Sequence, residues 1–142
     1  DSLVTGVQTC ALPISYSQIF TSTDEYLLCI TDGEVSDAET FIEWGLKLVS
    51  RAREARRTRV LVDNRTFSLN LSSLDIITFA NFLEDKGASK LGLRMAVLSN
   101  PHNPENSRMV ETALVNRSAS YKSFRNQVEA KEWLLREPLA PE

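Results

Sequence analysis

The sequence has few of the residues from which metal sites, disulfide frameworks and phosphate-binding loops are built. Its 142 residues include two cysteines, one histidine and five glycines. A single histidine argues against a zinc site, and two cysteines cannot build a disulfide framework. The glycines form neither a Gly-x-Gly-x-x-Gly nor a Walker-type spacing, which excludes the usual nucleotide-binding loops. We therefore expect no metal and no cofactor.

Long hydrophobic runs and strong charge are also absent. No window approaches the roughly 18 apolar residues that a membrane-spanning helix requires. The net charge of −3 is mild, which argues against a dedicated nucleic-acid-binding protein. The sequence therefore predicts a soluble, cytoplasmic protein that binds no nucleic acid and is not integral to a membrane.

The first 15 residues do not resemble part of a folded domain. The run from Val4 to Ile14 back-translates, codon by codon, to a sequencing-library adapter. We interpret residues 1–15 as a non-native, adapter-derived segment and exclude them from fold reasoning. The alternative is a short secretory hydrophobic region, but polar residues and Pro13 interrupt this apolar tract.

Without that segment, Cys29 is the single cysteine, and the net charge becomes −2 because Asp1 is the only charge removed. Cys29 lies in an apolar run, which favours a small buried residue. Residues 16–136 have a suitable length for one compact domain with a hydrophobic core. We expect residues 137–142, which include two prolines, to form a frayed tail.

Short apolar strands alternate with amphipathic helices along this domain. The expected strands are residues 16–21, 26–30, 59–62, 93–98 and 121–124, and the first two should form a hairpin. Ser36 and Glu39 have the spacing of a capping box at the first helix, and Asn103, followed by Pro104, should cap the third. This alternation predicts one α/β domain with a mainly parallel sheet of four to five strands, an N-terminal hairpin and about four helices.

The stretch from Val60 to Ala80 is where we expect a site. Its apolar strand ends on Asp63, and a polar loop then leads to Ser72 and Ser73 at the start of the second helix. Open α/β sheets place binding surfaces at the carboxyl ends of their strands. Arg65, in the same loop, could pair with Asp63 or bind an anion, and pairing is our preferred interpretation.

The second helix has more apolar residues than one buried stripe requires. We predict that this excess forms a contact surface for a protein partner or a homodimer. Its members are Ile77, Phe79 and Phe82.

Three runs resemble a known family: residues 60–65 (VLVDNR), 95–98 (MAVL) and 124–134 (FRNQVEAKEWL). Together with the order of elements, they resemble the bacterial STAS-like proteins, also described as SpoIIAA-like or STAS/SEC14 domains. The resemblance covers residues 16–135. It implies a non-enzymatic regulatory module that contacts another protein, and its SEC14-type label implies, as an alternative, a domain that binds a small molecule or lipid.

The resemblance also bears on the two serines. Family members of the anti-sigma antagonist type carry an Asp-Ser-Ser-Gly motif with one phosphorylated serine, and Ser72 and Ser73 fall where that pair would lie. Leu71 and Leu74 replace the flanking aspartate and glycine. Phosphorylation would add nearly two negative charges at the helix start. We favour the alternative that Ser72 is a helix cap, with Asp75 completing a capping-box-like pair.

Two further interpretations remain. A hydrolase could use His102, Ser99 and Asp63, but the serine has no Gly-x-Ser-x-Gly elbow, so a solvated loop histidine is favoured. The arginines between residues 51 and 59 suit the carboxyl end of a helix, where its dipole attracts cations, and they also suit contact with an anionic membrane surface or an acidic partner.

Overall fold

The structure is a computed structural model, and it describes residues 15–136. These residues form, in chain order, β2 (Tyr16–Ser22), β3 (Leu27–Val35), α2 (Ala38–Ala55), β4 (Arg59–Leu69), α3 (Ser73–Asp85), the short 3₁₀ helix η1 (Ala88–Leu91), β5 (Arg94–Leu98), α4 (Pro104–Val115), β6 (Ser120–Phe124) and α5 (Gln127–Leu135). Most of the segment that we interpret as adapter-derived, residues 1–14, and the predicted tail lie outside the described residues.

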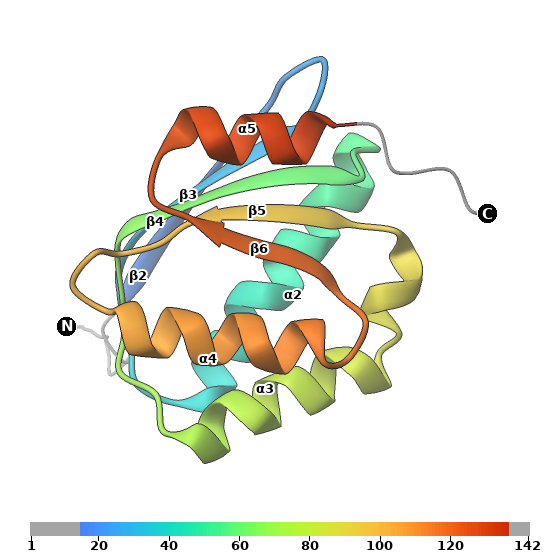
Figure 1. Cartoon of the computed structure of the whole chain (residues 1–142). Coiled ribbons are helices and arrows are strands. Elements are labelled where there is room, and N and C mark those ends of the chain that lie inside the picture. Colours follow the sequence, from blue (N-terminus) through green and yellow to red (C-terminus); the bar gives the residue numbers. More distant parts are fainter. Residues whose placement is uncertain (1–14, 137–142) are drawn as a thin grey trace, which may run out of the picture.

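The strands form one five-stranded sheet in the order β2-β3-β4-β5-β6. The β2–β3 pair is an antiparallel hairpin, and the other pairs are parallel. Helices α2, α3 and α4 cover one face, and α5 lies on the other face (Figure 1). The predicted α/β fold, with its mainly parallel sheet, N-terminal hairpin and four helices, is confirmed.

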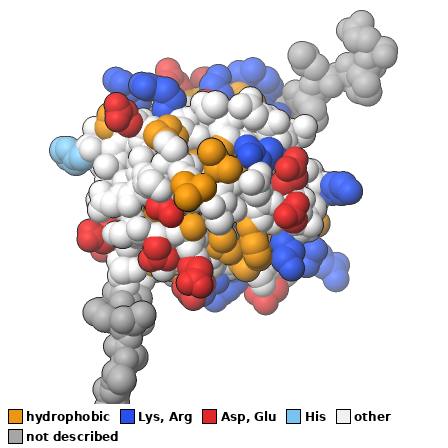
Figure 2. Space-filling view, turned by 90° about the horizontal axis from the view of Figure 1, so that it is seen from below, with side chains coloured by type: hydrophobic (Ala, Val, Ile, Leu, Met, Phe, Trp, Pro, Cys, Tyr) orange, Lys and Arg blue, Asp and Glu red, His pale blue; other side chains and the backbone are white. Residues whose placement is uncertain are grey.

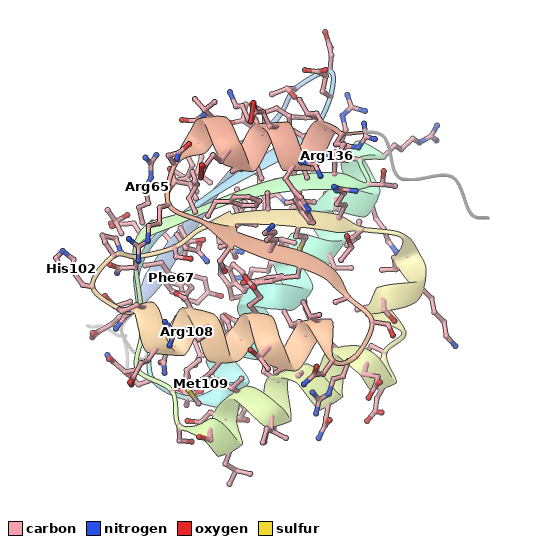
Figure 3. The ribbon with its side chains drawn as sticks, in the orientation of Figure 1. Arg65, Phe67, His102, Arg108, Met109 and Arg136 are labelled. Atoms are coloured by element: carbon pink, nitrogen blue, oxygen red, sulfur yellow. The ribbon has the colours of Figure 1, made fainter. Side chains whose placement is uncertain are left out.

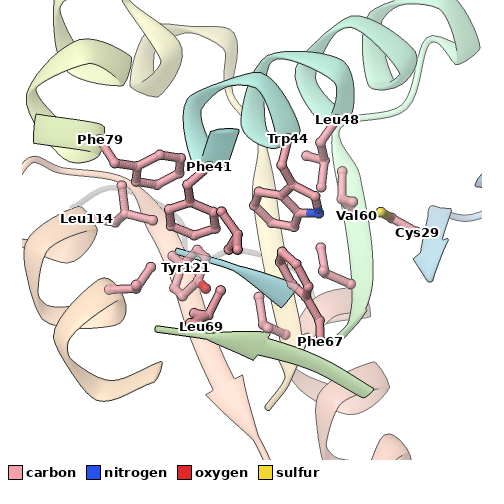
Figure 4. Close-up of a cluster of buried hydrophobic side chains, with 14 of the residues drawn as sticks. Cys29, Phe41, Trp44, Leu48, Val60, Phe67, Leu69, Phe79, Leu114 and Tyr121 are labelled. Carbon is pink, nitrogen blue, oxygen red and sulfur yellow. The ribbon is translucent and has the colours of Figure 1, made fainter. Parts of the chain in front are cut away.

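The main core lies between the sheet and helices α2 to α4, and stacked aromatic rings run through it (Figure 4). The ring of Phe41 stacks on Phe79 at 4.0 Å and on Trp44 at 5.2 Å between centroids. A Cβ atom at Gly45 would lie 3.1 Å from the Phe79 ring. The absence of a side chain at Gly45 therefore lets α2 and α3 approach closely around this stack.

Strand β4 is longer than the sequence predicts. We expect a strand over residues 59–62 followed by a polar loop, but β4 continues to Leu69 and stays paired with β3. The register shifts between the pairs Ile30–Asp63 and Asp32–Thr66, so β4 accommodates one extra residue as a bulge. Polar side chains do not prevent this pairing, because the ladder is made by backbone groups. Asp63 is thus not at the end of its strand.

Two helix features also differ from the expectation. The N-cap of α2 is Asp37, whose carboxylate accepts from Thr40 N at 2.8 Å, and the predicted Ser36 cap is wrong. Phe79, which we expect on a contact surface, is 2% exposed and belongs to the aromatic stack. Its position on the helix turns it toward α2, which the sequence of α3 alone does not reveal.

The contrast between Phe79 and Ile77 gives a direct test of this packing. Phe79→Ala should lower the free energy of unfolding by about 3–5 kcal/mol, because it leaves a cavity between α2 and α3. Ile77 is 45% exposed on the same helix, so Ile77→Ala should cost under about 1 kcal/mol. Urea unfolding of both variants provides the measurement, and equal losses would contradict the buried position of Phe79.

Candidate functional site

The sheet edge near α3 is shaped by two neighbouring strands of unequal length. Strand β5 ends at Leu98, opposite Asp63, whereas β4 continues to Leu69. On one side, the extended part of β4 pairs with β3, and Asn70 N donates to Val35 O at 2.9 Å. On the other side, β5 is no longer present, so these backbone groups need other partners.

Three asparagines between the end of β5 and the first turn of α4 supply those partners, and we call them the asparagine seam. Their side chains bind Phe67 O (Asn100, 3.2 Å), Leu69 N (Asn103, 2.9 Å) and both Leu71 N and Leu71 O (Asn106, 2.9 and 3.2 Å). The seam fixes the chain immediately before α3. Sequence reasoning missed it, although a spacing of three residues between asparagines after a strand was a visible signal.

Asn103 has a different role from the predicted one. It occupies the N-cap position of α4, but no side-chain cap hydrogen bond forms there. Its Oδ1 atom accepts from Leu69 N instead. The seam also borders an open hollow of about 580 Å³, whose rim includes His102, Glu105 and Asn70.

Ser72 and Ser73 lie at the start of α3, directly after Leu71, which lines this hollow. Ser72 Oγ accepts from Asp75 N at 3.1 Å, and Asp75 Oδ2 accepts from Ser72 N at 3.0 Å. The favoured capping box is therefore confirmed. Ser73 is the first helical residue and is exposed. Phosphorylation of either serine stays a prediction.

Asp63 and Arg65 form the preferred ion pair. Arg65 donates one hydrogen bond from Nη2 to Asp63 Oδ2 (2.8 Å) and another from Nε to Asp63 Oδ1 (3.0 Å). These hydrogen bonds lower the pKa of the Asp63 carboxyl, against the opposing effect of burial. The pair belongs to the bulged part of β4 and not to a loop.

The ion pair lies on the opposite face of the sheet from α3. Side chains alternate along a strand: Val60 and Val62 join the core under α2 to α4, and Leu61 packs in the cluster beneath α5. Asp63 follows Leu61 by two residues and shares its face. Figure 3 accordingly shows Arg65 on the α5 side and His102 at the start of α4. The structure thus separates Asp63 and Arg65 from Ser72 and Ser73.

The residues of the hydrolase hypothesis do not assemble. His102 is exposed and points away from the domain (Figure 3), Asp63 is held by Arg65, and Ser99 Oγ is buried without a partner. Within residues 15–136 no hydrogen bond joins these three side chains. The same residues contain no group of three or more His, Cys, Asp or Glu that could hold a metal ion, and none of their helices is long and apolar enough to cross a bilayer.

The chain is similar to the crystal structure of an uncharacterised protein of the DUF3478 family from Shewanella loihica PV-4, which has a SpoIIAA-like fold. The TM-score is 0.54 at 18% identity, and the match covers 89% of this chain and 99% of that one. The chain has a SpoIIAA-like fold. No family model matches the sequence, and no curated protein matches it.

This fold is that of the STAS-like domains, so the resemblance carried by residues 60–65, 95–98 and 124–134 identifies the architecture correctly. At this level of identity the similarity concerns the fold, and fold alone does not assign a function.

The asparagine seam can be tested through Asn106. Asn106→Ala should lower the free energy of unfolding by about 1–3 kcal/mol, because two backbone groups of Leu71 lose their partners. Asn116→Ala is the matched control: Asn116 is exposed at the end of α4, and its truncation should change stability by under about 0.5 kcal/mol. Urea unfolding measures both effects. Equal stability of the two variants would contradict the role of the seam.

The Asp63–Arg65 pair predicts a pH effect. The pKa of Asp63 is lower in the folded protein than in the unfolded chain, so the pair stabilises the fold above the unfolded pKa and loses this effect as pH falls through the folded pKa. Arg65→Gln should cost about 0.2–1 kcal/mol near neutral pH, since Arg65 is largely exposed. The difference in unfolding free energy between the wild type and Arg65→Gln should vanish in strong acid. Urea unfolding at a series of pH values measures it, and a difference that persists in strong acid would contradict the role of the pair.

Proposed function

We propose that this chain is a non-enzymatic, regulatory protein-interaction module whose contact surface is helix α3 with the loop before it. The observation that carries this proposal is the exposure of large apolar side chains on α3: Leu74 is 72% exposed and Ile77 is 45% exposed. Both lie in the first half of the helix, next to the capping box. Burial of such side chains drives protein association.

Helix α2 packs against α3 and also exposes an apolar side chain. Leu46 of α2 is 41% exposed, and Ile42 of α2 and Phe82 of α3 are half-buried. Figure 2 shows hydrophobic side chains gathered in the middle of the face seen from below, with charged side chains around them. We call Leu46, Leu74, Ile77 and Phe82 the α3 surface. An apolar centre with a polar rim is typical of protein interfaces.

The α3 surface differs from the predicted one in three residues: Phe79 is lost, and Leu46 and Leu74 are added. Phe79 is excluded because it is buried. Leu74, which sequence reasoning treated only as a departure from a family motif, is the most exposed large hydrophobic residue of the helix. The asparagine seam and the Ser72–Asp75 capping box fix the first turn of α3. A surface that is held in place before binding loses less conformational freedom when a partner docks.

Phosphorylation at this helix start would act on the same surface. Ser73 is exposed and immediately precedes Leu74. A phosphate on Ser73 would place nearly two negative charges at the rim of the α3 surface. Partner binding would then depend on modification, as the resemblance to anti-sigma antagonists implies. On Ser72 the same group would disrupt the capping box.

A small-molecule-binding role is the second candidate, because the domain has an apolar cavity. It measures about 60 Å³ and lies between α3, η1 and the starts of β5 and β6, lined by Ala80, Leu83, Leu93, Met95, Leu114 and Tyr121 among others. Ligand pockets usually measure about 300–1,000 Å³. The cavity fits a small apolar group, and a lipid chain would require α3 and η1 to move apart.

Native mass spectrometry of residues 16–142 distinguishes the two candidates. We expect a protein without added non-covalent mass, in which case a partner should be captured through a photo-crosslinker placed at Asn81, an exposed residue of α3. A co-purified small molecule would support the second candidate instead.

The α3 surface is then tested with the double variant Leu74→Ser, Ile77→Ser. It should weaken binding of the captured partner at least about tenfold, which corresponds to ~1.4 kcal/mol. Val128→Ser is the matched control, because Val128 is 70% exposed on α5, on the other face of the sheet. Equal partner affinity in both variants would overturn the proposed contact surface.

A further inference from the structure

Three arginines lie close together at the end of the sheet where β4 and β5 begin. Arg59 begins β4 and Arg94 begins β5, and the two are direct neighbours in the parallel register. Arg136 follows the last residue of α5, and Figure 3 shows it on the side where β4 and β5 begin. We call these residues the arginine cluster.

The side chains of the cluster share the α5 face of the sheet. Arg94 places its guanidinium carbon 4.1 Å from the centroid of the Trp133 ring of α5. Arg59 precedes Leu61 by two residues, and Leu61 packs beneath α5. Alternation along the strand therefore puts Arg59 on this face as well.

Among the residues that the structure describes, no carboxylate forms an ion pair with the cluster, although Glu132 lies one helical turn before Arg136. The carboxyl end of α5 contributes about half a negative charge. Three guanidinium groups carry three positive charges, so the helix dipole offsets only a small part of them.

Arg94 is also fixed in place, and one of its donors is buried without a partner. Its Nη2 atom donates to Trp133 O, and its Nε atom is buried without a partner. Burial and the neighbouring Arg136 and Arg59 lower the pKa of Arg94. Like charges on directly opposed residues destabilise a sheet. Repulsion within the cluster therefore lowers the stability of the folded protein.

We propose that the arginine cluster is a binding site for an oxyanion of the phosphate-monoester class. Guanidinium groups bind phosphate oxygens through paired, charge-assisted hydrogen bonds. A tetrahedral dianion has enough oxygens to contact three guanidinium groups, and its charge would relieve their repulsion. Arg136 is exposed and Arg59 is partly exposed, so a small anion can reach them. This site is independent of the α3 surface.

The probe is inorganic phosphate, titrated at constant ionic strength against chloride while NMR records the arginine Nε–H signals. Arg59→Gln and Arg136→Gln should each weaken phosphate binding at least tenfold. Arg108→Gln is the matched control, because Arg108 is exposed on α4, and it should bind phosphate like the wild type. Saturation with phosphate and its loss in both cluster variants support the site. Absence of a phosphate-specific response, or an equal loss in all three variants, would overturn it.

Two further arms complete the test. In phosphate-free buffer of low ionic strength, Arg136→Gln should be at least as stable to urea as the wild type, because it removes like-charge repulsion; a loss of stability would assign Arg136 a structural role and count against the site. Vesicles of phosphatidylcholine with and without phosphatidic acid then identify the source of the phosphate. Cluster-dependent retention on the phosphatidic acid vesicles indicates a lipid headgroup, and phosphate binding without retention indicates a free phosphate monoester.

Discussion

The extension of β4 beyond β5 is the constraint on which the candidate site depends. A strand that continues past its neighbour exposes backbone donors and acceptors along one side, and burial would make them costly if they stayed unpaired. Side-chain amides can replace the missing strand because each offers both a donor and an acceptor. The asparagine seam does this for Phe67, Leu69 and Leu71. It thereby joins the β5–α4 connection to the segment that leads into α3.

This arrangement lets α3 combine a packed face and an exposed apolar face. Phe79 and Ile76 are buried toward α2 and the sheet, and Leu74 and Ile77 face outward. The aromatic stack holds the helix against α2, and the seam holds its first turn. The exposed apolar side chains are therefore carried by a rigid element, as a preorganised contact surface requires. The arginine cluster lies at the other end of the sheet, where the strands begin.

Two interactions between residues close in sequence were predicted correctly, although the predicted Ser36 cap of α2 was wrong. Two features that depend on distant segments were not predicted. The Ser72–Asp75 capping box and the Asp63–Arg65 pair were predictable because each involves residues two or three positions apart. The length of β4 was not predictable, because polar residues after Val62 indicate a loop unless the partner strand is known. The place of Phe79 was also not predictable, since the apolar residues of α3 lie on more than one side of the helix and the sequence does not say which side α2 covers.

The sequence by itself determined the order of strands and helices, the mainly parallel α/β fold and the capped start of α3, because hydrophobic periodicity and helix capping act within a few residues. Tertiary structure decided which functional residues meet. It placed Asp63 and Arg65 on the face opposite Ser72 and Ser73, and it brought Arg59, Arg94 and Arg136 together from three elements. The physical reason is that strand register and the alternation of side chains select the face of each residue, and register is set by contacts between distant segments.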